Sequence, residues 1–316
     1  MTGYSRSVVA AILLALAASF CTATSSVFQR LGARGLEAGE PVTRAFDLML
    51  VFRLARRPAW LGGFACMVGG FLFQVSALRF GPLALVQPLL AVELLIVFGY
   101  LAALSRCRGV RGREWLAAVA MSAGLSVFLR AASPSGGREH APAELWWISG
   151  LVVLGLVAAA VAAAARGHSP ARRAALLGIA TGIAWGFVAA VIKEMSSHLG
   201  GGPAAVFGTW PVYVLMTSGA AAMLLASHAM TAGPLAASQP GFTLLDPVVA
   251  IVLGVLVFGE RLQASPAALV AQVAGLAVLA GGVAALSRSG LISQAPALVP
   301  GPRADRGTRE LTRKSR

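Results

Sequence analysis

Long apolar stretches follow one another along almost the whole chain. A helix needs about 20 predominantly apolar residues to cross the hydrocarbon core of a bilayer. Charged residues make up only 12% of the sequence and hydrophobic residues 57%, whereas about 25% of the residues of a soluble domain are charged. We expect the apolar stretches to form transmembrane helices at residues 7–28, 59–78, 83–104, 114–132, 145–165, 174–197, 207–229, 235–258 and 267–286. The expected fold is therefore an all-α, polytopic helical membrane protein, with nine transmembrane helices in one domain over residues 1–287.

A tenth candidate helix covers residues 42–55. It is short and contains Arg44, Asp47 and Arg53. A short, charged stretch is more typical of a helix that lies at the membrane surface than of one that crosses the membrane. We keep nine transmembrane helices as the prediction and ten as the alternative.

The net charge of +14 is distributed unevenly along the chain. Twenty of the 26 Lys and Arg residues lie at positions 29–58, 105–113, 166–173 and 288–316, all on one side of the membrane if nine helices cross it. Basic loops stay on the cytoplasmic side. We therefore expect a multi-pass protein of the cytoplasmic membrane with its C-terminus inside and, for nine helices, its N-terminus outside. Residues 288–316 are expected to form a disordered basic tail, and the charge indicates topology rather than a nucleic-acid partner.

The sequence contains an internal repeat. Residues 77–99 and 229–251 both carry Gly-Pro-Leu-Ala followed by Gln-Pro, 152 positions apart. A second match relates residues 120–125 (AMSAGL) to residues 271–276 (AQVAGL). The chain is therefore expected to consist of two related halves.

The matches relate the first four expected helices to the last four. Repeat one covers about residues 8–132, repeat two about residues 174–287, and the helix at 145–165 connects them. Equivalent helices are five apart, and because five is odd, the two copies cross the membrane in opposite directions. Inverted-topology repeats are typical of secondary transporters, which bind their substrate near the midplane between the repeats. A duplicated bundle without a transport role is the alternative.

Each copy carries one acid deep inside its apolar stretch, Glu93 in the first and Asp246 in the second. Each acid lies about 16–18 Å along a helix from the preceding Gly-Pro, which is near the centre of a core about 30 Å thick. An ionised carboxylate there costs about 2.5–3.5 kcal/mol. We therefore expect Glu93 and Asp246 to face a substrate, cation or proton site. A protonated acid that is hydrogen-bonded between helices is the alternative.

A proline interrupts each of these stretches, Pro88 in the first copy and Pro240 in the second. Proline lacks a backbone N–H and clashes with the preceding turn, so each helix should kink or break there. Carbonyl groups freed by a break can bind a substrate, a cation or a neighbouring helix.

The polar residues near the prolines complete the candidate site. Gln239, Thr243 and Asp246 share one stripe of an ideal helix, whereas Gln87 and Glu93 are out of phase. Only a kink in the first copy could bring Gln87 and Glu93 together. Asp246 is therefore the stronger of the two acidic candidates.

A lysine and an acid, Lys193 and Glu194, lie near the outer end of the sixth expected helix. They are candidates for a gate, although a simple interfacial pair is favoured. The histidines and cysteines show no metal-site or disulfide spacing, and no nucleotide-binding or hydrolase motif occurs. No metal, cofactor or enzymatic activity is therefore expected. Lesser candidates for lining residues are Gln74, Ser76, Trp185, Tyr213 and Thr217.

Several of these motifs resemble those of a known family. Gly81-Pro82 with Gln87-Pro88, then Phe258-Gly259-Glu260-Arg261-Leu262 and the glycine-rich residues 281–283, are similar to signatures of the drug/metabolite transporter superfamily. The resemblance covers most of residues 8–287 and is strongest to the EamA-like and magnesium-transporter-like branches. It implies a secondary carrier of the cytoplasmic membrane that moves a small metabolite or a divalent cation.

The leading functional hypothesis is a secondary transporter that moves a small organic solute by alternating access, coupled to protons or to another gradient. A transporter of Mg²⁺ or another divalent cation is the alternative, although hard cations need several oxygen ligands and the two acids supply few. A non-transporting scaffold or partner subunit is the third hypothesis. The expected partners are the lipid bilayer and the small-molecule or cation substrate, and a homodimer is a candidate assembly.

Overall fold

The computed structural model describes residues 2–33, 58–104, 112–167, 169–233 and 235–287. The candidate helix at 42–55 and the basic tail at 288–316 lie outside the described residues. The described helices and strands are α1 (Thr2–Ala33), α3 (Pro58–Phe80), α4 (Leu83–Leu90), α5 (Val92–Leu104), α6 (Gly112–Ala132), β1 (Ser135–Gly136), α7 (Ala143–Ala165), α8 (Pro170–Ser197), a 3₁₀ turn (His198–Gly201), α9 (Gly202–Phe207), α10 (Trp210–Thr231), α11 (Leu235–Leu256), β2 (Glu260–Arg261) and α12 (Pro266–Ser287).

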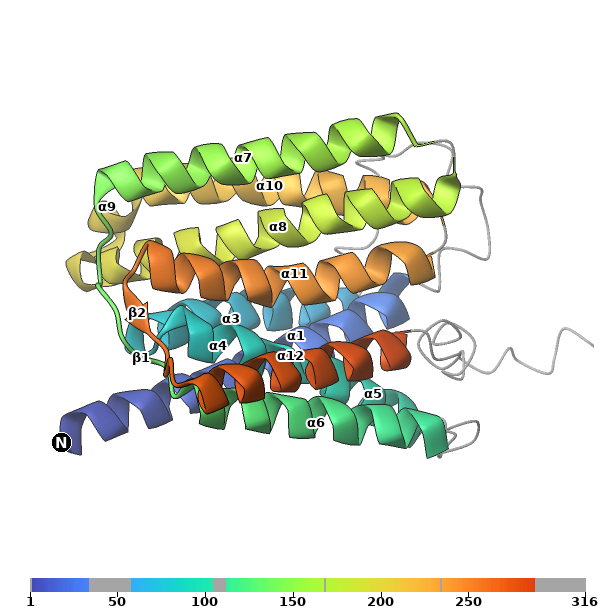
Figure 1. The fold of residues 1–316 in the computed structure, drawn as a ribbon, viewed down its shortest axis with the longest axis horizontal. Helices are drawn as coiled ribbons and strands as arrows, with labels where there is room; N and C mark the ends of the chain where they lie inside the picture. Colours follow the sequence, from blue (N-terminus) through green and yellow to red (C-terminus); the bar gives the residue numbers. More distant parts are fainter. Residues whose placement is uncertain (1, 34–57, 105–111, 168, 234, 288–316) are drawn as a thin grey trace, which may run out of the picture.

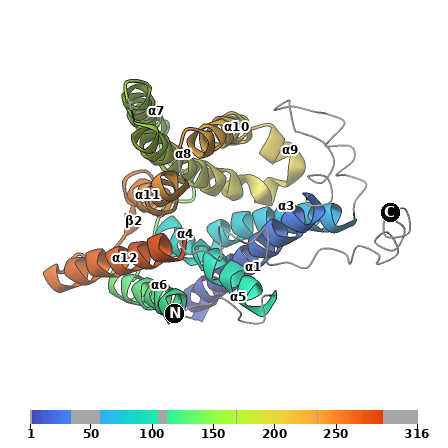
Figure 2. The ribbon, with the colours of Figure 1, turned by 90° about the vertical axis from the view of Figure 1, so that its right-hand side faces the viewer.

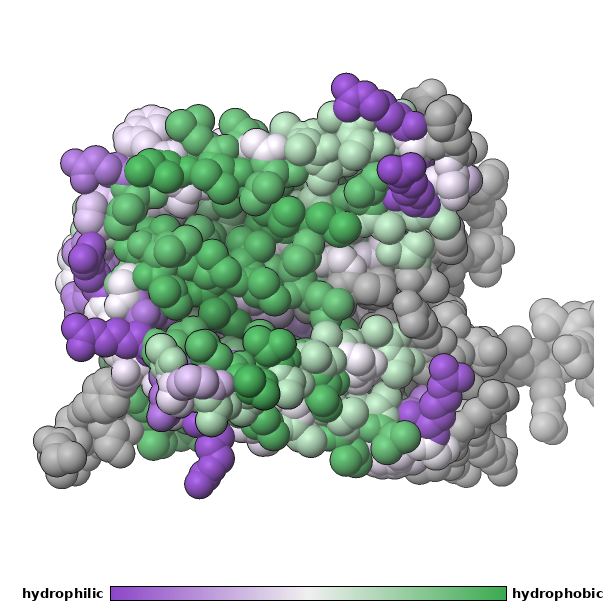
Figure 3. Space-filling view, in the orientation of Figure 1, coloured by the Kyte–Doolittle hydropathy of each residue, from purple (hydrophilic) through white to green (hydrophobic). Residues whose placement is uncertain are grey.

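The long helices coincide with the nine apolar stretches of the sequence, with the third stretch divided into α4 and α5. Helices satisfy their own backbone hydrogen bonds, as the hydrocarbon core of a membrane requires. Within the described residues, eight helical segments are long and apolar enough to cross a membrane, and α11 contributes the shorter apolar stretch Leu244–Leu256. Figure 3 shows a broad hydrophobic band with hydrophilic side chains gathered at the two ends of the molecule. The protein is a polytopic helical membrane protein.

The helices lie side by side, with their axes roughly aligned (Figure 1). In the view of Figure 2, α7, α8, α10 and α11 form one group, and α1, α3 to α6 and α12 form the other. The main packing pairs are α1 with α3, α8 with α10 and α11, and α6 with α12. The short strands β1 and β2 pair antiparallel, with Ser135 opposite Arg261, at the end of the bundle that carries the N-terminus.

Glycines bring α6 and α12 into very close contact. A Cβ atom at Gly124 would lie 2.7 Å from the carbonyl oxygen of Gly275, and one at Gly275 would lie 2.9 Å from the carbonyl oxygen of Gly124. Gly124 and Gly275 occupy equivalent positions in the repeated segments AMSAGL and AQVAGL. The contact between the two helices is therefore reciprocal. Only glycine allows two helix backbones to approach this closely.

The glycine stripe of α8 packs against α11 in the same way. A Cβ atom at Gly182 would lie 2.9 Å from the Cβ atom of Leu245, and one at Gly186 would lie 2.7 Å from the Cβ atom of Val249. Near the start of α11, a Cβ atom at Gly241 would lie 2.6 Å from the backbone of Gly178. Backbone therefore contacts backbone along most of this helix pair.

The two proline-containing segments differ. The first copy is broken: α4, which contains Pro88, ends at Leu90, and α5 begins at Val92 after a single turn residue. The second copy is not broken, because α11 continues through Pro240 to Leu256. A break at Pro240 is therefore not observed, and α11 continues through the position where Gly241 packs against α8.

A hydroxyl group from another helix supports the break between α4 and α5. Ser19 of α1 is only 1% exposed, and its Oγ lies 3.0 Å from the carbonyl oxygen of Ala15 in its own helix, 3.3 Å from that of Leu89 and 3.5 Å from that of Leu90. Carbonyl groups left without a helical partner need such a donor when no water is present. The broken segment is thus held by α1.

Candidate functional site

A central cavity of about 520 Å³ lies among α1, α3, α4, α5, α8, α10, α11 and α12. Its walls are mainly apolar, with Phe71 and Trp185 as aromatic members. The polar and acidic side chains that line it are Thr22, Gln74, Gln87, Glu93 and Asp246. The two acids that the sequence singles out therefore border the same space, and Gln74 and Trp185, two of the lesser candidates, border it as well.

Glu93 reaches this cavity because the helix is broken. It is the second residue of α5, directly after the break, and Ser26 of α1 donates a hydrogen bond of 3.5 Å to its Oε1. A carboxylate in the first turn of a helix is also favoured by the helix dipole. Gln87 is 5% exposed and lines the same cavity from α4. The break thus brings together two side chains that are out of phase on an ideal helix.

Asp246 approaches the cavity from α11. Its Oδ1 is buried and has no hydrogen-bond partner within the described part of the chain. A buried polar atom without a partner costs about 1–3 kcal/mol, so such an atom calls for an explanation. The side chains of Gln239, Pro240 and Thr243 lie outside those that the structure describes.

The ionisable side chains of this cavity are acids. The described residues that line it include two acids, Glu93 and Asp246, and no Lys, Arg or His. Within the described residues, no three His, Cys, Asp or Glu side chains gather as a metal site would require. The cavity therefore suits a proton or a positively charged group that fits between two carboxylates and an indole ring.

A further acid, the buried Glu260, joins three elements near the β1–β2 end of the bundle. It is 3% exposed and forms an ion pair with Lys193, which is 6% exposed. The Glu260 carboxylate also accepts hydrogen bonds from the backbone N–H groups of Leu83 and Ala84, the second at 2.9 Å. These N–H groups have no partner within α4, so Glu260 supplies the cap for this helix. The Lys193 Nζ lies 4.9 Å from the centre of the Phe258 ring.

Glu194, the next residue of α8, has different partners. Its carboxylate accepts hydrogen bonds from the Ala141 N–H at 3.1 Å and the Trp146 Nε1–H at 3.3 Å. His140 Nδ1 lies 3.2 Å from the same carboxylate. Lys193 and Glu194 therefore do not form an interfacial pair, and that expectation is wrong. The residues between β1 and α7 contact Glu194, and Glu260 of β2 contacts Lys193, so both side chains are buried rather than exposed to the headgroups.

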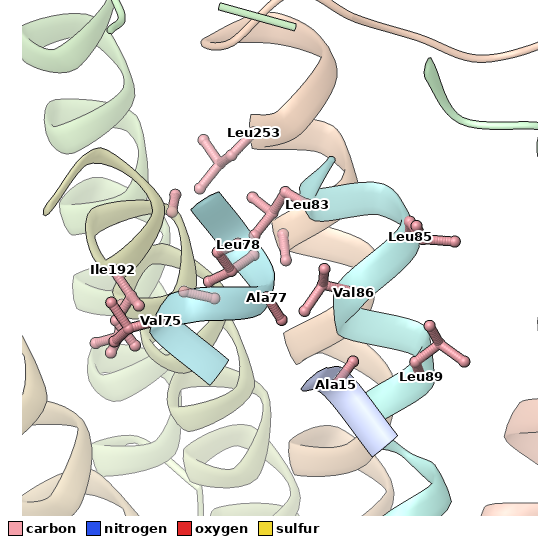
Figure 4. Close-up of a cluster of buried hydrophobic side chains, with 14 of the residues drawn as sticks. Ala15, Val75, Ala77, Leu78, Leu83, Leu85, Val86, Leu89, Ile192 and Leu253 are labelled. Carbon is pink, nitrogen blue, oxygen red and sulfur yellow. The ribbon is translucent and has the colours of Figure 1, made fainter. Parts of the chain in front are cut away.

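A smaller cavity of about 380 Å³, which we call the vestibule, lies at the same end of the bundle. The residues that define it here are Arg79, Phe80, Pro82, Gly137, Arg138 and Lys193. Buried apolar residues separate the vestibule from the central cavity. Pro82, directly before α4, lines the vestibule, Gln87 of α4 lines the central cavity, and residues 83–86 between them are buried. Figure 4 shows part of this apolar layer, with Leu78, Leu83, Val86 and Leu253 gathered between α3, α4 and α11.

The sequence did not indicate Glu260 or Trp146 as part of the site. Glu260 follows a transmembrane stretch, where an acid is normally exposed, and its burial depends on contacts with α4 and α8. Two lesser candidates lie away from the cavities: Tyr213 is 60% exposed, and Thr217 donates to the Tyr213 carbonyl oxygen of its own helix. The signal in the sequence that could have identified Glu260 is the family motif that contains it.

Comparisons with known proteins add one relative. The chain is 28% identical over 285 residues to an uncharacterized protein of Corynebacterium glutamicum, and the match covers 88% of this chain and 95% of that protein. No family model matches the sequence, and no solved structure matches it.

Proposed function

We propose that the protein is a secondary transporter of the drug/metabolite transporter type, which moves a small organic solute across the cytoplasmic membrane by alternating access. The observation that carries the proposal is the central cavity. Glu93 and Gln87 of the first sequence copy and Asp246 of the second copy all line it. A cavity at the meeting point of two repeats is where secondary transporters bind their substrates.

The packing supports an inverted repeat. In this proposal nine helices cross the membrane, α1 to α6 belong to repeat one (about 8–132), α7 is the connector, and α8 to α12 belong to repeat two (about 174–287). Packing of α1 on α3 then corresponds to packing of α8 on α10, and α4 contacts its counterpart α11. The reciprocal contact of Gly124 and Gly275 is the contact that a two-fold relation between the repeats would create.

In this proposal the apolar layer and the Lys193–Glu260 ion pair close one side of the central cavity. Alternating access requires the cavity to be closed on at least one face of the membrane at any time. Here the layer around Leu83 and the Lys193–Glu260 pair close the central cavity toward the vestibule. We assign Lys193 and Glu260 to the gate on this side, which the distribution of basic residues places outside, with the C-terminus in the cytoplasm.

The chemistry of the cavity favours a solute that carries a positive charge, exchanged for protons. Two carboxylates with no described basic neighbour can release protons when a cation enters and rebind them when it leaves. Mg²⁺ or another divalent cation is the second candidate, because both carboxylates and the Gln74, Gln87 and Thr22 oxygens line one space. In a scaffold without transport the two acids would serve as hydrogen-bonding groups between helices, whereas Oδ1 of Asp246 has no such partner among the described residues.

Transport in sealed vesicles with an imposed pH gradient tests the proposal. We expect a panel of organic cations to include a substrate whose proton-coupled flux falls at least tenfold in Glu93→Gln and in Asp246→Asn. Glu144→Gln, which removes an exposed acid at the start of α7, is the matched control and should retain the flux.

The alternatives give different results in the same vesicles. Uptake of Mg²⁺ that depends on Asp246, without flux of any organic solute, would favour the divalent-cation function. Unchanged flux in both acid variants would refute the central cavity as the transport site.

A further inference from the structure

The vestibule contains positively charged groups that the proposed transport site does not use. Arg79 lies in the last turn of α3, Arg138 lies in the connection between β1 and α7, and Lys193 belongs to α8, so three separate elements bring a cationic side chain to one cavity of about 380 Å³. Within the described residues, neither Arg79 nor Arg138 forms an ion pair. Unpaired arginines from different elements in one cavity call for a ligand or for solvent.

Glycine backbone lies close to each of the two guanidinium groups, where a side chain would occupy the same space. A Cβ atom at Gly200 would lie 3.3 Å from a terminal nitrogen of Arg79, and one at Gly259 would lie 3.9 Å from Nε of Arg138. Gly137 has a φ of +103° and lies against the ion pair, since a Cβ atom there would lie 3.1 Å from Cγ of Glu260 and 3.8 Å from the Lys193 Nζ. Glycine is needed at Gly137 both for this conformation and for this approach.

The charges leave a net positive vestibule. Glu260 neutralises Lys193, and Glu139, which also lines the cavity, offsets one arginine. One positive charge therefore remains, spread over two guanidinium groups. Guanidinium groups bind carboxylate and phosphate oxygens through paired N–H donors, which makes them suited to a monoanion.

We propose that the vestibule is a binding site for a small anionic group, a carboxylate or a phosphate, held by Arg79 and Arg138 next to Lys193. The inference concerns a second site and does not depend on the function of the central cavity. The bound anion would lie beside the Lys193 ammonium group and compete with Glu260 for it. Anion binding would then weaken the contact that caps α4, and so connect the vestibule to the closed side of the transporter.

The test measures the local charge with cysteine reagents of opposite sign. Phe80→Cys places a thiol in the vestibule, in a chain that also carries Cys21→Ala, Cys66→Ala and Cys107→Ala. The purified protein in phosphatidylcholine nanodiscs is treated with negatively charged methanethiosulfonate ethylsulfonate or with its positively charged ethyltrimethylammonium analogue. Each rate is divided by the rate of the same reagent with a free thiol.

We expect the anionic reagent to react about tenfold faster after this normalisation, because one charge about 6 Å away in water changes a local concentration roughly threefold in each direction. Arg79→Gln or Arg138→Gln takes the net charge of the vestibule from +1 to 0 and should largely abolish the preference, and the double variant, with a net charge of −1, should reverse it. Arg130→Gln removes the same charge from the end of α6 without touching the vestibule, and should leave the preference intact. Val8→Cys on α1, which also lines the vestibule, is the second reporter.

Added anions identify the source of the ligand. Slower labelling in 10 mM inorganic phosphate or acetate would show that a soluble anion occupies the site. Slower labelling only when the nanodiscs contain phosphatidylglycerol would show that a lipid phosphate occupies it, and both results support an anion site. Equal normalised rates for the two reagents at both reporter positions, or a preference that survives loss of both arginines, would overturn the proposal.

Discussion

The Glu260 carboxylate holds the Lys193 ammonium group and the first N–H groups of α4 at the same time. Glu260 lies beyond α11, Lys193 lies near the end of α8, and α4 is the first half of the broken helix. One side chain therefore connects segments that belong to both halves of the chain. Because these groups are nearly fully buried, separating them exposes charge to an apolar environment, and their contact is well suited to a closed gate.

The first prediction concerns this ion pair. Glu260→Gln leaves the Lys193 charge buried without a counter-charge, and we expect the free energy of unfolding to fall by about 3–5 kcal/mol. Lys193→Met leaves the carboxylate with its two N–H donors and should cost less. Unfolding in mixed detergent micelles measures both values.

The double variant Lys193→Met/Glu260→Gln separates a specific pair from two independent losses. If the side chains interact directly, its destabilisation is clearly smaller than that of the two single variants combined. Simple additivity would contradict the direct interaction.

Most of the architecture could be predicted from local properties of the sequence. Apolar length alone located the helices, because a membrane requires each segment to satisfy its own backbone hydrogen bonds. The repeat then indicated which acids correspond, and Glu93 and Asp246 do line one cavity. Pro88 predicted the break in the first copy, which the structure confirms.

Other features depend on contacts between distant residues, which local patterns do not specify. The hydropathy of the sequence is compatible with Glu260 in a solvated loop, and only the approach of α4 and α8 buries it. Pro240 occupies the same place in its helix as Pro88, yet α11 stays intact and packs on the α8 backbone at Gly241. Lys193 and Glu194 are neighbours in sequence and still have separate partners.

The second prediction separates a functional acid from a structural one at Asp246. The Oδ1 atom has no hydrogen-bond partner among the described residues, so Asp246→Asn removes an uncompensated acid from the interior. We expect the free energy of unfolding to rise by about 1 kcal/mol while transport is lost. Thermal unfolding of the purified variant provides the measurement. A clear fall in stability would indicate that Asp246 serves mainly to hold the helices together.

The third prediction concerns Ser19, whose Oγ lies 3.3 Å from the Leu89 carbonyl oxygen at the helix break. Ser19→Ala removes this contact and leaves the Leu89 carbonyl oxygen with the Ala91 N–H, and we expect a loss of about 1 kcal/mol in unfolding free energy. Hydrogen exchange of the backbone amides near Val92 should become faster. Ser126→Ala is the matched control, because Ser126 is exposed and donates only within its own helix. Equal effects of the two substitutions would show that Ser19 does not support the break.

The fourth prediction tests the contact between α6 and α12. A methyl group at Gly275 would lie 2.7 Å from the Phe128 backbone nitrogen and 2.9 Å from the Gly124 carbonyl oxygen, so Gly275→Ala must push the two backbones apart. Overpacking of this kind costs about 1–3 kcal/mol, and helix propensity recovers at most about 1 kcal/mol.

Gly281→Ala on the same helix meets no atom within 4 Å and should keep or raise stability. Unfolding of the two variants side by side gives the comparison, and a Gly275→Ala protein as stable as Gly281→Ala would show that α6 and α12 do not pack through their glycines. Because Gly124 is the equivalent position in the other copy, Gly124→Ala should produce a loss similar to that of Gly275→Ala, whereas a contact without two-fold symmetry has no reason to give matching values.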